Sequence, residues 1–201
     1  MPNVPNVVIV ASGGANIASL QFALERLNVP SLVSGDADAI GRATHVILPG
    51  VGAAANAMAR LRRDGLHEVI PKLRQPVLGI CLGMQLLFES SDEGDTRCLG
   101  IIEGRATRFT EAQGRPVPHI GWNTVQIGRD SPLLAGIRGD DYAYFVHSYA
   151  LPVTSATVAS TQYGTSFAAC VEWGNFFGAQ FHPERSAAVG ARMLRNFLAI
   201  T

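Results

Sequence analysis

The sequence is poor in cysteine and in charge of either sign. It has three cysteines, and 16% of its 201 residues are charged, with 16 basic residues against 16 acidic ones. Three scattered cysteines do not make a disulfide framework, and their spacing is not that of metal ligands. The balanced charge, without a basic run, argues against binding to nucleic acid or to an anionic membrane. The composition therefore predicts a protein of a reducing compartment that needs no bound metal.

Long hydrophobic runs are also missing. No stretch approaches the length of about 20 apolar residues that a membrane-spanning helix requires, and the first residues lack the basic-then-apolar pattern of a secretion signal. We therefore expect a cytoplasmic protein. Hydrophobic residues still make up 47% of the chain, which is enough for a substantial core. Because no linker, repeat or low-complexity segment divides the chain, residues 1–201 are predicted to form one domain.

The first half of the chain alternates between strand-like and helix-like segments. Apolar runs at 7–10, 46–48 and 77–80 are typical of buried strands, and the residues at 17–27 and 56–66 have the pattern of amphipathic helices. This alternation predicts an α/β fold with a central, mostly parallel sheet flanked by helices.

The second half changes character, because from residue 105 to 182 short strands and turns replace the alternation. Added antiparallel strands are therefore expected there. The predicted elements are strands at 116–118, 122–127, 142–146 and 176–181, and an amphipathic helix at 187–200 with Ser186 as its N-cap.

The most informative segment surrounds Cys81. A strand-like run at 77–80 leads straight into this cysteine, and residues 82–89 have the composition of a helix. Gly79 and Gly83 flank it as Gly-x-Cys-x-Gly, the thiol form of the nucleophile elbow. Partial positive charge at a helix N-terminus favours a thiolate there. A buried core cysteine is the alternative, and the two glycines favour the nucleophile.

A nucleophilic cysteine needs a base, and His182 is the best candidate among five histidines. Pro183 holds the residue before it in extended geometry, so the side chains of His182 and Glu184 should point the same way. Glu184 would then orient the imidazole, which predicts a Cys81–His182–Glu184 triad. Taken alone, His-Pro-Glu is also typical of a surface turn after a strand.

With these two motifs the sequence resembles the triad-type, class I glutamine amidotransferases. Within that family it is most similar to the glutaminase subunits of imidazole glycerol phosphate synthase, and the resemblance spans nearly the whole chain. The segments that carry it are 48–52, 81–85, 98–104, 118–123, 144–149, 177–186 and 194–198.

The first loop departs from the family pattern. Related subunits often carry Asp-Tyr-Gly followed by Asn, whereas residues 11–16 read Ala-Ser-Gly-Gly-Ala-Asn. Gly13 and Asn16 are retained and the acidic residue is lost. The loop is not part of the triad, so glutamine hydrolysis remains the expectation.

The resemblance implies a reaction and a partner. The chain would hydrolyse glutamine through a thioester on Cys81 and pass ammonia to a (β/α)₈-barrel cyclase subunit that makes imidazole glycerol phosphate. Amide hydrolysis needs no cofactor, and the sequence shows no cofactor motif. A glutaminase of another synthase, a stand-alone cysteine hydrolase and a catalytically silent homologue are the alternatives.

The remaining site residues follow in part from the elbow and in part from the resemblance. The elbow's geometry makes the Leu82 amide one oxyanion donor, and the resemblance adds that of Val51. It also places the substrate against Gln85 and Glu93, although Glu93 equally fits a solvated helix end. The other substrate-binding residues it implies are Gly50, Gly52, His147, Ser148 and Tyr149.

The same resemblance turns Trp122 and Asn123 toward the partner subunit. For Trp122, a buried position in the core is the alternative. His119 and His147 lie in strand-like segments, where histidines are more often hydrogen-bonded structural residues than acids or bases.

Overall fold

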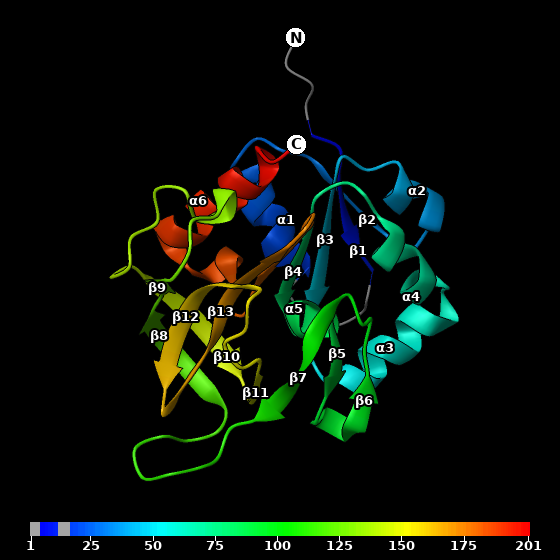
Figure 1. Ribbon diagram of the computed structural model, residues 1–201. Coiled ribbons are helices and arrows are strands. Elements are labelled where there is room, and N and C mark those ends of the chain that lie inside the picture. Colours follow the sequence, from blue (N-terminus) through cyan, green and yellow to red (C-terminus); the bar gives the residue numbers. More distant parts are fainter. Residues whose placement is uncertain (1–4, 12–16) are drawn as a thin grey trace.

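An eight-stranded sheet crosses the molecule in the computed structural model, which describes residues 5–11 and 17–201 (Figure 1). The strand order is β2-β1-β3-β4-β14-β13-β12-β9. The first five strands in this order are parallel, and the last three join antiparallel. Their bounds are β2 (Ser31–Ser34), β1 (Val7–Val10), β3 (His45–Gly50), β4 (Val77–Cys81), β14 (Phe176–Ala179), β13 (Thr165–Trp173), β12 (Thr157–Tyr163) and β9 (Gln126–Ile127).

Two smaller sheets stand beside the main one. Strand β10 (Tyr142–His147) pairs antiparallel with β8 (His119–Thr124). The other sheet runs β11-β7-β5-β6. Its strands are β11 (Tyr149–Ala150), β7 (Ile102–Arg108), β5 (Phe88–Ser91) and β6 (Thr96–Arg97).

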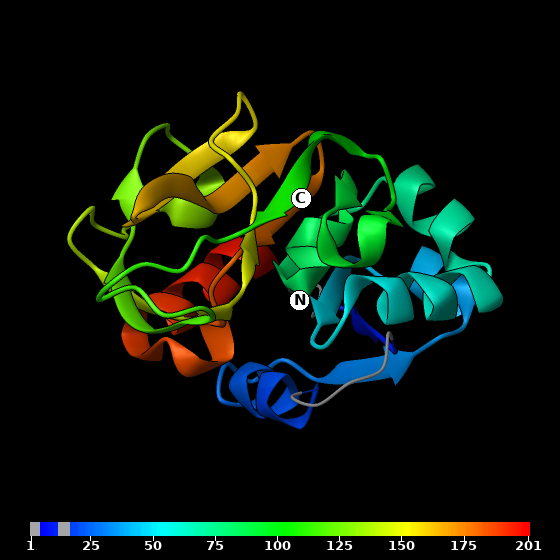
Figure 2. The same cartoon turned by 90° about the horizontal axis from the view of Figure 1, so that it is seen from below.

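Helices cover both faces of the main sheet. Seen from below, α1 and α6 lie on one side and α3 and α4 on the other (Figure 2). The α-helices are α1 (Ile17–Glu25), α2 (Ala37–Gly41), α3 (Ala54–Arg63), α4 (Leu66–Val69), α5 (Leu82–Leu86) and α6 (Ala187–Leu198). Short 3₁₀ helices are η1 (Ile70–Lys72), η2 (Glu93–Asp95), η3 (Pro132–Leu134) and η4 (Pro183–Arg185). Among helices of the described residues, none is both long and apolar enough to span a bilayer.

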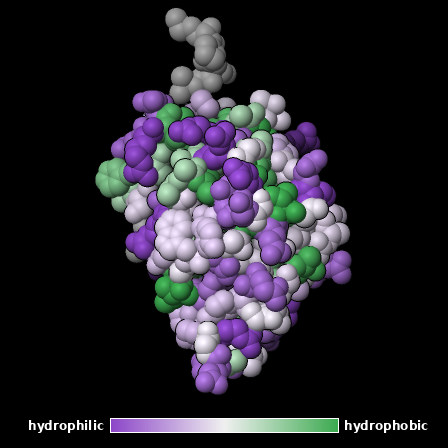
Figure 3. Space-filling view, turned by 90° about the vertical axis from the view of Figure 1, so that its left-hand side faces the viewer, coloured by the Kyte–Doolittle hydropathy of each residue, from purple (hydrophilic) through white to green (hydrophobic). Residues whose placement is uncertain are grey.

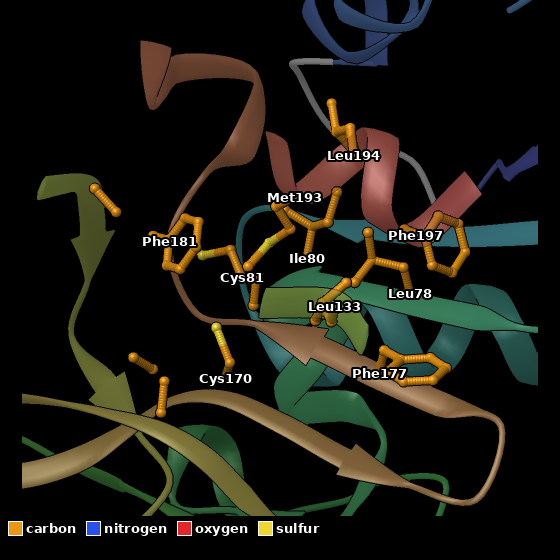
Figure 4. Packing of buried hydrophobic residues seen from close by; sticks show 14 of the residues in the cluster. Leu78, Ile80, Cys81, Leu133, Cys170, Phe177, Phe181, Met193, Leu194 and Phe197 are labelled. Atoms are coloured by element: carbon orange, nitrogen blue, oxygen red, sulfur yellow. The ribbon is translucent and has the colours of Figure 1, made fainter. Parts of the chain in front are cut away.

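The side chains of alternate residues in the central strands pack into two separate hydrophobic cores, one on each face of the sheet. Val7 and Ile9 of β1 pack with α1 and α6, whereas Val8 and Val10 pack with α3 and α4. This is the period of two expected when both faces of a strand are covered. Figure 4 shows Cys81 among the side chains of the first core, with Cys170 of β13 in the same cluster.

The predicted fold class is confirmed, and several predicted boundaries are wrong. The helix after Cys81 ends at Leu86, and β5 begins at Phe88, which pairs with Ile102. No strand forms at 116–118, where two prolines lack the N–H that a ladder requires. The segment 122–127 is two strands, since β8 starts at His119 and breaks before β9.

Two further boundaries differ at the C-terminal end. Strand β14 ends at Ala179, two residues before the predicted end, and α6 ends at Leu198. Ser186 precedes α6 as predicted, but its hydroxyl makes no capping hydrogen bond to that helix. The hydroxyl instead forms hydrogen bonds with Tyr144 and His182.

Candidate active site

The backbone at Cys81 has the geometry of a nucleophile elbow. Cys81 ends β4 and precedes α5, and its φ and ψ are 52° and −111°. A side-chain-bearing residue rarely adopts positive φ, so the surrounding structure must hold it there.

The flanking glycines explain how the elbow is held. A Cβ on Gly83 would lie 1.8 Å from the Leu48 carbonyl oxygen of β3, and one on Gly79 would lie 2.7 Å from the Gly83 oxygen. A Cβ on Gly50 would lie 2.7 Å from the Gly83 nitrogen. Only glycines allow the start of α5 to approach β3 and β4 so closely. The 50–52 loop is thereby pressed against the elbow.

His182 lies near Cys81 because β14 is the neighbour of β4. Ala179 lies opposite Ile80 in the parallel ladder, so the residues after both strands emerge at the same sheet edge. Beyond β14, the Nδ1–H of His182 donates to Oε1 of Glu184 across 2.8 Å. The His182 and Glu184 side chains are 8% and 3% exposed, so water barely screens the pair.

His182 is tuned to carry a proton. Burial alone would lower its pKa, but hydrogen bonds to the Cys81 and Glu184 side chains, and the charges of both groups, raise the pKa above its ordinary value. This favours the imidazolium form of His182, between the Cys81 sulfur and the Glu184 carboxyl group. The arrangement suits a thiol that must be ionised before it attacks.

Ser186 ties the catalytic loop to β10. The Tyr144 N–H donates to Oγ of Ser186 across 2.9 Å, and this hydroxyl donates to the His182 carbonyl across 2.7 Å. The His182 N–H in turn donates to the Tyr144 carbonyl across 3.0 Å. Ser186 is fully buried. The three bonds form a closed ring, which explains why the hydroxyl does not cap α6.

A pocket of about 240 Å³ opens over Cys81. This is below the range of about 300–1,000 Å³ typical of pockets for drug-sized ligands, and it suits a small metabolite. The lining residues are Val51, Gly52, Cys81, Leu82, Gln85, Glu93, Val146, His147, Ser148, Tyr149 and His182. Except for Glu184, Gly50, Trp122 and Asn123, every predicted site residue thus lines one pocket.

The exceptions have clear positions. Glu184 contacts His182 from behind, and Gly50 pairs with Cys81 in the ladder between β3 and β4. A larger hollow of about 310 Å³ lies beside Phe109 and Arg115, but neither cysteine nor histidine lines it. The first-loop residues Gly13 and Asn16 lie outside the described residues.

Glu93 has a second role beside lining the pocket. Its Oε2 accepts a hydrogen bond from the Ala54 N–H across 2.7 Å. Ala54 is the first residue of α3, and Ala53 before it offers no side-chain cap. Glu93 therefore caps α3 from a distant segment, a function that the sequence did not indicate.

His119 and His147 form a buried neutral pair. Nδ1–H of His147 donates to the Tyr149 carbonyl across 2.9 Å, which leaves Nε2 to accept from Nδ1–H of His119 across 3.1 Å. Burial lowers the pKa of His119 to about 4 and that of His147 to about 3. Both are hydrogen-bonded structural histidines, as the sequence favoured, and His147 also forms part of the pocket wall.

Trp122 and Asn123 point to opposite faces of β8. The Trp122 side chain is 52% exposed, which excludes a core position, and its ring contacts that of Tyr144. The Asn123 amide instead donates inward, to the Gln162 carbonyl and to His119. The exposed apolar face of β8 and β10 consists of Ile120, Trp122 and Tyr142.

Comparison with known proteins identifies the family. Residues 15–200 match the family described as glutamine amidotransferase class-I. The chain is 54% identical over 196 residues to the imidazole glycerol phosphate synthase subunit HisH of Xanthomonas campestris pv. campestris (strain 8004), covering 98% of each chain. The chain belongs to the HisH family of class I glutamine amidotransferases. This amidotransferase is also 54% identical over 192 residues to HisH of Xylella fastidiosa (strain Temecula1 / ATCC 700964), covering 96% of each.

Solved structures share the fold of this amidotransferase. A structure described as a putative GMP synthase subunit, from Thermoplasma acidophilum, superposes with a TM-score of 0.75 at 17% identity, over 98% of this chain and 94% of that one. A structure described as a glutamine amidotransferase superposes with a TM-score of 0.73 at 21% identity, over 96% of each chain. At these identities the likeness concerns architecture alone.

Two residues beside Cys81 and His182, namely Gln180 and Ser186, had no role in the amidotransferase site assigned from sequence. Both belong to the matching segment 177–186, where Gln180 was assigned no role and Ser186 was predicted only as the N-cap of the following helix. The amide of Gln180 contacts Cys81, and the hydroxyl of Ser186 holds His182. The available signal was their position in the chain, since Gln180 lies between β14 and His182, and Ser186 lies between His182 and α6.

Proposed function

We propose that this chain is the glutaminase subunit of an imidazole glycerol phosphate synthase. It hydrolyses glutamine to glutamate and ammonia and supplies the ammonia to a cyclase subunit. The observation that carries the proposal is a cysteine at positive φ that lines one small pocket together with His182, whose buried ring is hydrogen-bonded to Glu184.

The reaction proceeds in two steps on Cys81. The thiolate attacks the carboxamide carbon of glutamine, and the imidazolium of His182 gives its proton to the departing nitrogen, so ammonia leaves and a γ-glutamyl thioester remains. The neutral His182 then takes a proton from water, whose oxygen attacks the thioester. Glutamate leaves as the sulfur recovers its electron pair and the imidazole its proton.

The oxyanion of each tetrahedral state needs preplaced N–H donors. We assign these to the amides of Leu82 and Val51, since both residues line the pocket beside Cys81. Gly52, which follows Val51, adopts a φ of 85° and leaves open space where a side chain would lie, so the loop that carries the Val51 N–H is not crowded on this side.

The substrate's amino-acid head is assigned to the rim of the pocket. Gln85 and Glu93 would receive the α-ammonium group, and the backbone of residues 147–149 and of Gly50 would hold the carboxylate. Both hydrogens of the Gln85 amide are already donated, to the Tyr149 carbonyl and to Gln180, so its oxygen is what remains for the ammonium.

The relatives are subunits of a synthase, and a partner subunit is part of the proposal. We assign it to a (β/α)₈-barrel cyclase docking on the exposed face of Ile120, Trp122 and Tyr142. On the side of the molecule that carries α6, β8 and β9, hydrophobic residues form small groups separated by hydrophilic ones (Figure 3). Docking would then depend on a few large side chains. The whole chain would act as one cytoplasmic domain, and the chemistry needs no cofactor.

The decisive experiment measures glutamate release from glutamine, by the chain alone and with a cyclase subunit plus its nucleotide ligand. Slow release that rises steeply with the liganded partner, and is absent in Cys81→Ala, is the expected result. Release that the partner leaves unchanged would contradict the synthase assignment. Release that survives in Cys81→Ala would contradict the mechanism.

A further inference from the structure

Gln180 is buried beside the nucleophile and belongs to no part of the triad. It follows β14, its exposed fraction is 0%, and its Nε2 lies 3.7 Å from Sγ of Cys81. This is hydrogen-bonding distance for sulfur, whose larger radius lengthens the bond. A buried amide in this position needs a reason, because burying polar groups is costly.

The orientation of the Gln180 amide follows from the Tyr149 carbonyl, to which it is linked through the side chain of Gln85. The oxygen and nitrogen of a glutamine side chain are distinguished by their partners. The Tyr149 carbonyl can only accept, and it lies 2.8 Å from the Gln85 amide, so the group facing it must be Nε2. The flipped amide would place two oxygens against each other.

The second hydrogen of Gln85 then determines how Gln180 is oriented. Nε2 of Gln85 lies 2.9 Å from Oε1 of Gln180, which accepts that hydrogen. Since its oxygen is occupied there, the amide of Gln180 must turn its N–H toward Cys81.

The effect of the Gln180 N–H on the Cys81 sulfur depends on the other groups that contact this sulfur. The Cys81 thiol lies 3.7 Å from the Val146 carbonyl, to which only the protonated sulfur can donate. A thiolate facing that carbonyl is disfavoured, whereas an N–H donor favours the charged form. The N–H of Gln180 thus opposes the effect of Val146 and assists His182.

We propose that Gln180 is a further catalytic residue, whose N–H stabilises the Cys81 thiolate and whose orientation is imposed by Gln85 and the Tyr149 carbonyl. This rests on the proposed role of Cys81 as nucleophile and adds to it a neutral donor outside the triad and the oxyanion hole. The titratable groups around the sulfur are His182 and Glu184 beyond β14, His147 on β10 and Glu93 at the rim, and the variants below keep all four.

The test is the pH profile of Cys81 alkylation by iodoacetamide in Gln180→Met, which removes the N–H and keeps the length of the side chain. Loss of a donor to the thiolate should move the midpoint of the profile up by about one pH unit and slow alkylation about tenfold below it. Gln180→Leu, as a second apolar variant, should show the same shift. Cys81→Ala gives the background from the buried Cys98 and Cys170.

Thr161→Val is the matched control. Thr161 is also fully buried, and its hydroxyl donates to the Thr124 carbonyl across 2.9 Å, in a part of the sheet away from the thiol. It should lose stability and keep the wild-type midpoint. An unchanged midpoint in both Gln180 variants, or an equal shift in Thr161→Val, would overturn the proposal. Because alkylation uses no glutamine, either result is independent of whether glutamine is the substrate.

Discussion

At the scale of single residues, the proposed catalytic histidine, His182, depends on its carboxylate partner. Glu184→Gln keeps the shape of the side chain and removes the charge beside His182. Because that charge helps to raise the pKa of His182, the variant should lower it, which an NMR titration of the imidazole measures. We expect glutaminase turnover to fall on the order of 10²–10⁴-fold, as when other triads lose their acid.

Glu111→Gln provides the comparison, since Glu111 is an exposed residue in a 3.6 Å ion pair with Arg108. Its turnover and its His182 titration should match the wild type. A Glu184→Gln variant with wild-type turnover would show that Glu184 plays no part in the reaction.

A second prediction for His182 concerns its hydrogen bond with Ser186. Ser186→Ala removes the acceptor of the Tyr144 N–H and the donor to the His182 carbonyl. Buried groups that lose a partner cost about 1–3 kcal/mol of unfolding free energy. Turnover should fall while KM for glutamine stays near wild type, because the serine positions His182 and does not line the pocket. A change confined to KM would contradict this.

At the scale of secondary-structure elements, the elbow requires close contact between α5 and β3. Gly83→Ala would place a methyl group 1.8 Å from the Leu48 oxygen. Backbone on both sides limits relaxation, so we expect a loss of about 3 kcal/mol or more in urea unfolding.

Gly41→Ala is the matched test of a glycine without such a contact. Gly41 ends α2, and nothing lies within 4 Å of a Cβ placed there. The variant should be neutral or gain up to about 1 kcal/mol, because alanine is the better helix former. Equal effects at Gly83 and Gly41 would show that contact with β3 is unimportant.

The sequence revealed the elements whose residue pattern is local. The β-branched run at 7–10 and the glycines around Cys81 specify a strand and an elbow through short-range geometry. The strand over 88–91 could not be read in the same way, because Phe88 is a strand residue only by virtue of its parallel pairing with Ile102. Likewise, the cap that Glu93 provides to α3 joins segments 39 residues apart.

Roles that depend on two distant groups were also hidden from the sequence. Nothing local to Ser186 distinguishes an N-cap from a hydroxyl that bridges β10 and His182. Trp122 and Asn123 lie in a predicted strand, whose alternation places neighbours on opposite faces, and a partner-facing role for Asn123 stays a prediction.

At the scale of the whole molecule, Trp122 and Trp173 offer a matched pair. Each side chain is 52% exposed, and they lie on different strands, β8 and β13. Trp122→Ala should leave stability nearly unchanged and weaken binding to the cyclase by about 30-fold or more, as for a tryptophan at the centre of an interface. Trp173→Ala should bind normally. Titration calorimetry measures both, and equal affinities would exclude the proposed docking face.

The stability of the whole chain should depend on pH through its buried histidines. His119 and His147 stay neutral in the folded state down to about pH 4 and about pH 3, whereas an unfolded chain binds those protons below about pH 6.5. Unfolding therefore takes up protons, and the free energy of unfolding falls as pH drops from 6 to 4, by about 1.4 kcal/mol per pH unit for each histidine.

His147→Gln should reduce this slope in urea unfolding series, and Thr161→Val should leave it unchanged, because it removes a buried hydrogen bond without a titratable group. An identical slope in His147→Gln and the wild type would contradict the neutral pair.

Because β4 pairs with β14, which comes much later in the chain, the site can be completed only late in synthesis. His182 leaves the ribosome 101 residues after Cys81, which at about 5–20 residues per second takes about 5–20 s. Throughout that interval the nucleophile exists without its base, and β4 lacks one neighbour and presents an open edge. Residues 176–182 therefore cover this edge and bring His182 beside Cys81 late in synthesis, so a product truncated before residue 182 lacks the proposed base.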